Sequence, residues 1–236
     1  MADADSLVQR LELSKQRIGL ACARAGRNPA SVRLLPITKG FPAETVRQAM
    51  GLGLTEFGEN RIQEAEPKIA AVTPRPRWHL VGHLQSNKAK RAVQLFDVIH
   101  SLDSAGIARE VAKRAAQEGR EPVCLVEVNT SGDATKFGAA PGEVLALLRL
   151  VRELAPIRLA GLMTIGPLGG GPEGARASFR ALAALRRQAA DEGILGQDAE
   201  LSMGMSDDFE IAIEEGSTMV RIGTALFGVR PARAPV

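Results

Sequence analysis

The sequence contains no tyrosine, one tryptophan and only 3% aromatic residues in total. Proteins that bind single-stranded nucleic acid usually stack bases on aromatic rings beside a basic groove, so this composition argues against that function. The net charge is only +3, and the single dense basic segment is Lys88-Ala89-Lys90-Arg91. Because such segments are common on solvated helix faces, we favour that interpretation. A scaffold or nucleic-acid partner that uses Lys88, Lys90 and Arg91 remains an alternative.

Cysteine and histidine are also scarce. Cys22 and Cys124 lie far apart and form no CxxC motif, and the three histidines are scattered. This pattern supports neither a disulfide framework nor a metal site. No apolar run reaches the roughly 18 residues that a membrane span needs, and residues 1–6 lack the basic and apolar regions of a signal peptide. We therefore expect a cytoplasmic protein without membrane association.

What the chain does contain is a regular alternation of strand-like and helix-like segments. The predicted strands cover 33–38, 54–57, 77–82, 96–101, 122–128, 157–162, 199–203 and 218–222. The predicted helices between them cover 43–51, 60–71, 87–95, 105–118, 141–154, 173–192 and 207–215, and a short helical turn is expected after Gly223. Apolar residues at helical spacing predict a further amphipathic helix over 4–25, before the first strand.

This alternation predicts a parallel sheet, because helical crossovers join parallel strands. Right-handed crossovers leave two architectures, a closed barrel or an open doubly wound sheet. Eight strands in 236 residues and the lack of a GxGxxG motif after the first strand favour the barrel. We predict an α/β protein with a (β/α)8 TIM barrel, a single domain over residues 1–236 with an extra N-terminal helix. The glycine-rich segment 166–172 is either a mobile lid or a plain connection.

Lys39 follows the first predicted strand, at the rim where barrel enzymes place their functional groups. Taken alone, such a lysine is most often an ordinary surface residue. Ser206 opens the predicted seventh helix, and Gly223-Thr224 follows the eighth strand. Phosphate sites in barrels often use these two loops, although Ser206 and Gly223 could also serve only as a helix cap and a turn. An amine facing a phosphate site suggests a Schiff base with a phosphorylated aldehyde, and pyridoxal 5'-phosphate (PLP) is the leading candidate.

Other polar residues lie near the same rim. Arg221 lies in an apolar run two residues before Gly223, where a buried arginine needs partners. Asn60 follows the second strand and either caps the next helix or extends into the pocket. His79 lies within the third strand, where a satisfied core histidine is more common than a base, whereas His83 at the rim is the better candidate for ligand contact.

Several long motifs together resemble one known family. They are Thr38-Lys39, Phe57-Gly58-Glu59-Asn60, Trp78-His79 through Gln85-Ser86-Asn87-Lys88, Gly161-Leu162-Met163, Ser202-Met203-Gly204-Met205-Ser206-Asp207-Asp208 and Gly216-Ser217-Thr218-Met219-Val220-Arg221-Ile222-Gly223-Thr224. The combination resembles the pyridoxal phosphate homeostasis protein family, which looks like the N-terminal barrel of alanine racemase standing alone. The resemblance covers nearly the whole chain from about residue 30 onward, in motifs that are long and specific.

The resemblance implies a cofactor-binding set for PLP, which consists of Lys39, Asn60, Met163, Ser206, Arg221, Gly223 and Thr224. In that family the lysine forms the Schiff base, the serine, glycine and threonine contact the phosphate, and the arginine lies at the pyridine nitrogen. The asparagine lies beside the ring, and the methionine lines the pocket. The pair Gly40-Phe41 departs from the more polar pair expected after the lysine, which affects how this loop contacts ligands.

These residues favour binding over turnover. PLP is the best electron sink when its pyridine nitrogen is protonated, and an arginine opposes that state because it can only donate hydrogen bonds. The two-base racemisation of alanine racemase also needs a tyrosine from a partner subunit. This chain has no tyrosine, and we expect no C-terminal β domain that would build the racemase dimer. We expect no catalytic residues but a monomeric PLP carrier that buffers PLP or delivers it to apoenzymes. The alternatives are a one-base PLP-dependent racemase or decarboxylase and a lysine aldolase acting on a phosphorylated sugar.

Overall fold

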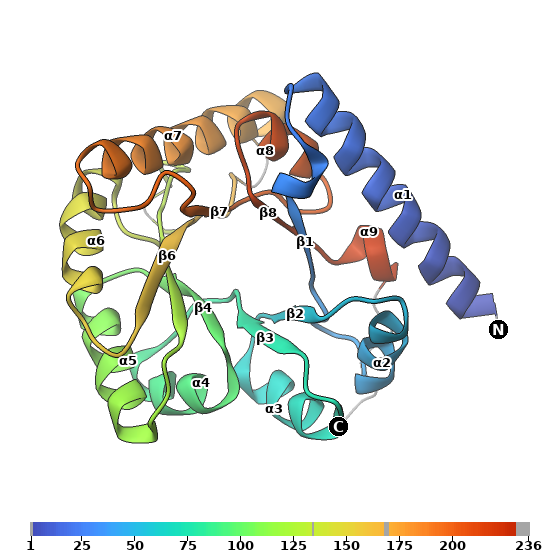
Figure 1. Cartoon of the computed structure of the whole chain (residues 1–236), viewed down its shortest axis with the longest axis horizontal. Coiled ribbons are helices and arrows are strands. Elements are labelled where there is room, and N and C mark those ends of the chain that lie inside the picture. Colours follow the sequence, from blue (N-terminus) through green and yellow to red (C-terminus); the bar gives the residue numbers. More distant parts are fainter. Residues whose placement is uncertain (1, 134, 168–169, 230–236) are drawn as a thin grey trace.

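Eight parallel strands form one sheet at the centre of the protein, with helices outside it (Figure 1). The structure, a computed structural model, describes residues 2–133, 135–167 and 170–229. The strands are β1 (Arg33–Pro36), β2 (Glu56–Glu59), β3 (Arg77–Leu80), β4 (Val98–Leu102), β5 (Val123–Glu127), β6 (Arg158–Met163), β7 (Glu200–Ser202) and β8 (Met219–Ile222). Their order is β1-β8-β7-β6-β5-β4-β3-β2, and a bridge between Ile37 and Gly58 joins β1 to β2. The predicted barrel is therefore confirmed.

The helices follow the strands in the expected order. They are α1 (Ala2–Arg24), α2 (Ala43–Gly51), α3 (Ile62–Ala71), α4 (Ala89–Leu95), α5 (Ala105–Glu118), α6 (Val144–Arg152), α7 (Gly171–Asp191), α8 (Phe209–Glu214) and α9 (Thr224–Phe227), with short 3-10 turns at Pro29–Ser31, Ser86–Lys88 and Pro141–Glu143. The expected turn after Gly223 is thus confirmed as α9. Leu168 and Gly169, the middle of the glycine-rich segment, lie outside the described residues.

Several elements begin later than the sequence suggests, for example β4 at Val98 rather than at residue 96, and the structure explains two of these shifts. The second strand starts at Glu56 rather than at residue 54, because Gly53 with φ 86° turns the chain and the pairing runs from Glu56 opposite Arg77 to Glu59 opposite Leu80. The seventh predicted helix starts at Phe209 rather than at residue 207. Residues before a helix often form a turn closed by a side chain, and here the Asp208 carboxylate accepts the Met205 N–H at 2.6 Å.

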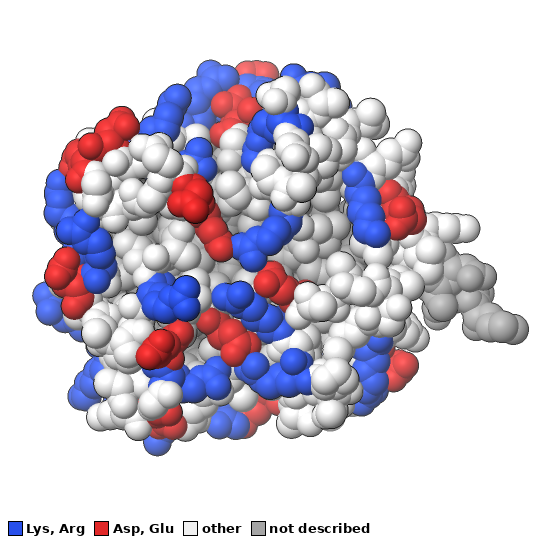
Figure 2. Space-filling model, in the orientation of Figure 1, with Lys and Arg blue, Asp and Glu red and all other residues white. Residues whose placement is uncertain are grey.

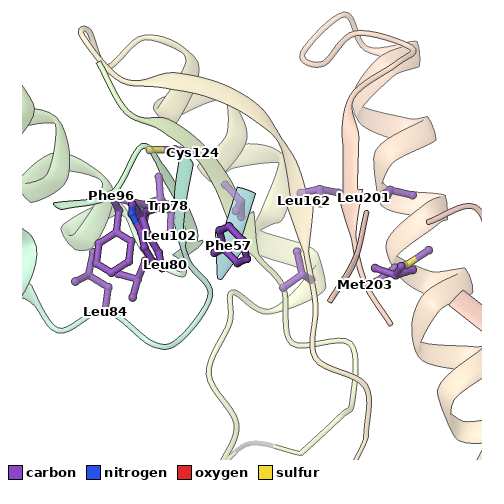
Figure 3. Packing of buried hydrophobic residues seen from close by; sticks show 14 of the residues in the cluster. Phe57, Trp78, Leu80, Leu84, Phe96, Leu102, Cys124, Leu162, Leu201 and Met203 are labelled. Carbon is purple, nitrogen blue, oxygen red and sulfur yellow. The ribbon is translucent and has the colours of Figure 1, made fainter. Parts of the chain in front are cut away.

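Most of the apolar core lies between the sheet and the helices, because alternate strand residues point outward. Figure 3 shows part of this cluster, including Phe57, Trp78 and Phe96. Trp78 is 0% exposed, and its ring centroid lies 5.9 Å from that of Phe57 in a tilted arrangement. Truncating either ring to alanine would cost about 3–5 kcal/mol of unfolding free energy. The strands are therefore held from outside, and their inward positions are free to carry polar groups.

The N-terminal helix packs on the two short helices that follow β7 and β8 (Figure 1). The Arg10 Nε atom donates to the Leu226 carbonyl at 2.8 Å, and Arg17 pairs with Glu210 at 3.1 Å. The Arg17 guanidinium also lies 4.5 Å from the centre of the Phe209 ring. Helix α1 thus braces α8 and α9 from outside the barrel.

The described residues show neither a membrane span nor a metal cluster. Among the helices of the described ranges, none has the length and apolar character to cross a bilayer. No three His, Cys, Asp or Glu side chains in those ranges are grouped to hold a metal ion. Cys22 and Cys124 are both buried, free thiols.

Candidate functional site

A cavity of about 330 Å³ opens at the C-terminal ends of the strands. It brings together residues far apart in the sequence, including six of the seven predicted cofactor-binding residues: Lys39, Asn60, Ser206, Arg221, Gly223 and Thr224. The wall is completed by Ile37, Phe41, Val81, Ile165, Met205 and Asp207. One amine, two hydroxyl groups and one guanidinium therefore converge on one apolar hollow.

Met163 lies apart from these residues. It is the last residue of β6 and is fully buried in a small cluster with Val98 and Leu125 inside the barrel. Its Cα pairs with those of Glu127 and Ser202, so it lies in the barrel interior, and it is not among the described residues that line the cavity. Its predicted pocket contact stays a prediction.

A buried ion pair holds the chain just before Lys39. The Thr38 hydroxyl donates to the Glu59 carboxylate at 2.6 Å, and the Lys68 amine donates to the Thr38 carbonyl at 2.7 Å. Lys68 and Glu59 are themselves hydrogen-bonded and buried. Burial raises the pKa of Glu59, and the charge of Lys68 opposes that rise. The end of β1 is thus tied to β2 and α3 through two groups that were not predicted as site residues.

The helical pattern contained the signal for Lys68. Ile62, Ala65 and Lys68 follow each other at intervals of three on one helix face, and all three are buried. Residues at this spacing lie on the same face, so a lysine in line with two apolar residues indicated a buried ammonium. Glu59 had no comparable signal, because its partner comes from a different element.

The loop after Lys39 is fixed by one polar and one apolar contact. The Gly40 N–H donates to the Glu64 carboxylate. The Phe41 ring lies 5.3 Å from the Phe227 ring of α9, centroid to centroid. The unexpected Gly40-Phe41 pair therefore joins the lysine loop to α3 on one side and to α9 on the other.

The loops after β7 and β8 contact each other at the predicted phosphate end. The Ser206 hydroxyl accepts the Ala225 N–H at 3.2 Å. Ser206 precedes α8 by three residues, so the expectation that it opens this helix is wrong. Gly204 has φ 93°, and a Cβ there would lie 2.5 Å from the Ala212 Cβ, so only glycine lets α8 pack this closely. The serine is thereby placed beside the start of α9.

Asn60 lines the cavity and is not a helix cap. The N-cap of α3 is Arg61, which makes no side-chain capping bond, so the capping alternative for Asn60 is wrong. Gly82, just beyond β3, lies against its backbone, because a Cβ at Gly82 would be only 2.1 Å from the Asn60 carbonyl. This close packing fixes the backbone position of Asn60, directly after the end of β2.

Arg221 is buried in the barrel interior, 4% exposed, and reaches the cavity floor. It donates to the Ser202 carbonyl at 2.6 Å, to the Ser202 hydroxyl at 2.8 Å and to the Thr164 carbonyl at 2.8 Å. Burial lowers its pKa to about 10, and the negative charges of Asp208 and Glu127 act in the other direction. The guanidinium is therefore charged at neutral pH. Its bonds to Ser202 and Thr164 supply the partners expected from the sequence for a buried arginine.

The two rim and strand histidines have different surroundings. His79 is buried, and its Nδ1 atom lies 2.9 Å from His100 Nε2, which confirms the core interpretation. His83 has a 28% exposed side chain, stacks on the Phe137 ring at 3.6 Å and lies 3.3 Å from Asp103. It lines a neighbouring cavity of about 630 Å³ that shares Asn60 with the first. Ligand contact by His83 remains a prediction.

Comparison with known proteins matches the family model "Alanine racemase, N-terminal domain" over residues 22–231. The pyridoxal phosphate homeostasis protein of Aquifex aeolicus is 43% identical over 223 residues, covering 94% of this chain and 97% of that protein. The Pseudomonas aeruginosa protein of the same name is 46% identical over 222 residues, with 93% and 94% coverage. The chain belongs to the pyridoxal phosphate homeostasis protein family.

Solved structures agree with that family assignment. PipY of Synechococcus elongatus, solved with PLP bound, superimposes with a TM-score of 0.79 at 39% identity, covering 91% of this chain and 99% of that one. Alanine racemase of Clostridium difficile has a TM-score of 0.75 at 15% identity, covering 97% of this chain and 60% of the enzyme. At that identity the likeness concerns the fold alone. The pyridoxal phosphate homeostasis family and alanine racemase thus share this barrel.

Proposed function

We propose that this protein binds PLP as a reversible Schiff base on Lys39 and acts in intracellular vitamin B6 homeostasis, buffering PLP in the cytoplasm or delivering it to apoenzymes. The observation that carries the proposal is the convergence of Lys39 with Ser206, Gly223 and Thr224 on one cavity. A volume of about 330 Å³ suits a small ligand of this kind. The names of the relatives and the PLP in the PipY structure support it.

The residues of the cavity fit the different ends of the proposed ligand. The Lys39 amine can add to an aldehyde carbon with loss of one water, and hydrolysis reverses this step. The hydroxyls of Ser206 and Thr224 and the nearby start of α9 suit a phosphate, because N–H groups in a first helical turn lack intrahelical acceptors. Arg221 would donate to the pyridine nitrogen, which keeps that nitrogen unprotonated. Bound PLP supplies an electron sink, and this arginine weakens it.

The test is a visible spectrum of the purified protein before and after borohydride, followed by peptide mapping. We expect a Schiff-base absorbance band, its loss on reduction, and a pyridoxyl group on Lys39. Lys39→Ala should abolish the band, whereas Lys113→Ala, at an exposed position of α5, should keep it. A band that survives Lys39→Ala, or a label on another lysine, would refute the assignment.

Turnover is tested on the same loaded protein. Incubation with amino acids, while their chirality and carbon dioxide release are followed, separates a carrier from a racemase or decarboxylase. We expect neither reaction, because the chain has no tyrosine to act as the second base of a two-base racemase. Stoichiometric release of PLP to an apoenzyme would support delivery, and multiple turnovers on an amino acid would contradict the carrier proposal.

A further inference from the structure

A line of polar side chains, all of them buried except the last, crosses the barrel interior from the cavity floor to the opposite end. It starts at Arg221 and runs through Ser202 of β7 to His100 of β4, whose Nδ1 lies 3.1 Å from the Ser202 hydroxyl. His100 Nε2 lies 2.9 Å from His79 Nδ1, and His79 Nε2 lies 3.5 Å from the Glu56 carboxylate at the start of β2. The last step is the longest, and no other described residue lies closer to His79 Nε2 as a hydrogen-bond partner.

The chemistry of the two ends determines where every proton lies. A guanidinium can only donate and a carboxylate can only accept. Arg221 donates to the Ser202 oxygen, so the serine has its own proton left to donate to His100 Nδ1. His100 must then carry its proton on Nε2 and donate it to His79 Nδ1. His79 in turn carries its proton on Nε2, directed at Glu56.

The opposite arrangement carries two penalties. If His100 carried its proton on Nδ1, the Ser202 oxygen would accept two bonds and its own buried proton would be left without a partner. His79 would then present a bare Nε2 lone pair to the Glu56 carboxylate. A buried polar group without a partner and a lone pair facing a carboxylate are both unfavourable, so the first arrangement is preferred.

Burial, helped by nearby positive charges, favours the neutral form of both rings. Burial is the largest cause that lowers the pKa of each histidine, and the positive charges of Arg33 and Arg77 at the starts of β1 and β3 add to it. Glu56 raises the pKa of His79, whereas Arg221 and His79 lower that of His100 further. Figure 2 shows Lys and Arg side chains interleaved with Asp and Glu around the centre of one face. Because arginine keeps its proton, this line of side chains does not conduct protons. Its role is to orient the hydrogen-bonding groups along it.

We propose that His100 is a positioning residue for Arg221. His100 Nδ1 accepts a hydrogen bond from the Ser202 hydroxyl. This bond turns the serine lone pairs toward the guanidinium and so holds Arg221 at the cavity floor. His79 and Glu56 hold His100 in the matching tautomer. The proton arrangement stands independently of the ligand, whereas its effect on PLP rests on the proposed function.

The tautomers are measured first, on the ligand-free protein. Long-range nitrogen NMR spectra of 15N-histidine-labelled protein separate neutral from charged rings and one tautomer from the other. The sequence has only three histidines, so single-histidine variants assign the signals. At pH 7 we expect His79 and His100 to be neutral with the proton on Nε2. A charged His100, or a proton on its Nδ1, would overturn the proposal.

The second measurement compares serine variants. Ser202→Ala removes the donor to His100 Nδ1, so it should lower the share of the Nε2–H tautomer, which His79 and Glu56 still favour. It should also weaken PLP retention by about tenfold, the loss expected for one hydrogen bond to a charged group. Ser202→Thr keeps a hydroxyl and should restore both properties. Ser101→Ala is the matched control, because Ser101 follows His100 in β4 and its buried hydroxyl has no hydrogen-bond partner in the part of the chain that the structure describes. It should change neither the tautomer nor the retention.

A third variant isolates the histidine. His100→Phe leaves Ser202 and Arg221 in place but removes the acceptor, and should shift the Arg221 Nε–Hε resonance and weaken PLP retention severalfold. Unchanged Arg221 resonance in a folded His100→Phe protein would contradict the positioning role. If the unaltered protein binds no PLP, the proposed function fails, while the tautomer and Arg221 measurements still decide this inference.

Discussion

Glu127 is a titratable residue that the proposed function does not use. It ends β5 and is buried, and its Oε2 atom has no hydrogen-bond partner among the described residues. Burial raises its pKa from the ordinary 4.5 to about 7, the charge of Asp103 adds to the rise, and Arg221 opposes it. The folded protein therefore keeps a proton between these two pH values that the unfolded chain has already released. Folding is favoured by this group in acid, and the benefit disappears as the pH rises through 7.

Glu127→Gln tests this directly. The glutamine keeps the shape but not the proton, so the variant should match the unaltered protein near pH 4 and be more stable above pH 7. The expected gain is about 3–4 kcal/mol, because the pKa rises from 4.5 to about 7 and each tenfold difference in proton affinity between the folded and unfolded states corresponds to roughly 1.4 kcal/mol. Urea unfolding at a series of pH values measures it. Glu143→Gln, at an exposed position, should leave the pH profile unchanged. Equal stability of the Glu127 variant and the unaltered protein at pH 8 would disprove the raised pKa.

The buried histidines titrate in the opposite direction. Their pKa values in the folded state lie below the ordinary 6.5, so the unfolded chain gains protons first as the pH falls. Stability should therefore decrease below about pH 6.5. This loss should be steeper in Glu127→Gln than in the unaltered protein, because the carboxyl group no longer offsets it. A stability profile of the glutamine variant that stays flat from pH 7 to pH 5 would show that the histidines are not buried as neutral rings.

At the scale of single elements, the ion pair of Lys68 and Glu59 joins α3 to β2 and supports the end of β1. Lys68→Met should lower the unfolding free energy by about 3–5 kcal/mol, because it leaves a buried carboxylate without its counter-charge. The double variant Lys68→Met, Glu59→Gln should recover part of that loss. Thermal unfolding of Lys68→Met, Glu59→Gln and the double variant gives the coupling energy between the two side chains.

The exposed Lys113 of α5 provides the control for this pair. Lys113→Met should change stability by less than about 0.5 kcal/mol, as surface substitutions usually do. Equal effects of Lys68→Met and Lys113→Met would mean that the buried pair contributes no stability.

The elements were largely predictable from the sequence, whereas their contacts were not. Apolar runs at strand spacing and amphipathic runs between them are local signals, and they predicted the helices over 43–51 and 105–118 with the observed bounds. The start of β2 depends on pairing with β3, and the place of Ser206 depends on the turn closed by Asp208. The first is a contact with another strand that the local pattern does not reveal, and the second is a local turn that takes the place of the expected first helical turn.

In the candidate site, too, the positions of the residues were predictable from the sequence and the contacts that support them were not. The positions of Lys39, Ser206, Gly223 and Thr224 follow from the rule that parallel strands end at one rim, and all four line the cavity. The contacts that support the site come from elsewhere in the chain. Lys68 of α3 and Phe227 of α9 contact the residues on either side of Lys39, and Ser202 of β7 holds Arg221. Nothing in a single segment indicates which distant group completes such a bond.

At the scale of the whole molecule, α1 lies outside the barrel but contacts the helices next to the predicted phosphate loops. Leu11 of α1 is 3% exposed, whereas Leu13 is 55% exposed. Leu11→Ala should lower the unfolding free energy by about 2–4 kcal/mol through the cavity it leaves. It should also increase amide hydrogen exchange in α8 and α9 more than in α4.

The exposed neighbour is the control in that experiment. Leu13→Ala should change neither stability nor exchange, since surface changes stay within about 0.5 kcal/mol. If Leu11→Ala increased exchange equally in all helices, α1 would stabilise the barrel as a whole and would not act as a specific brace for these two.

The full burial of Trp78 has a practical consequence. With no tyrosine and no second tryptophan in the chain, ultraviolet emission excited beyond the phenylalanine bands originates from this single indole. Its emission wavelength reports whether water reaches the core between β3 and the helices, without any added label. A chromophore bound at the rim would also quench that light by energy transfer, so one optical signal can follow both unfolding and ligand capture.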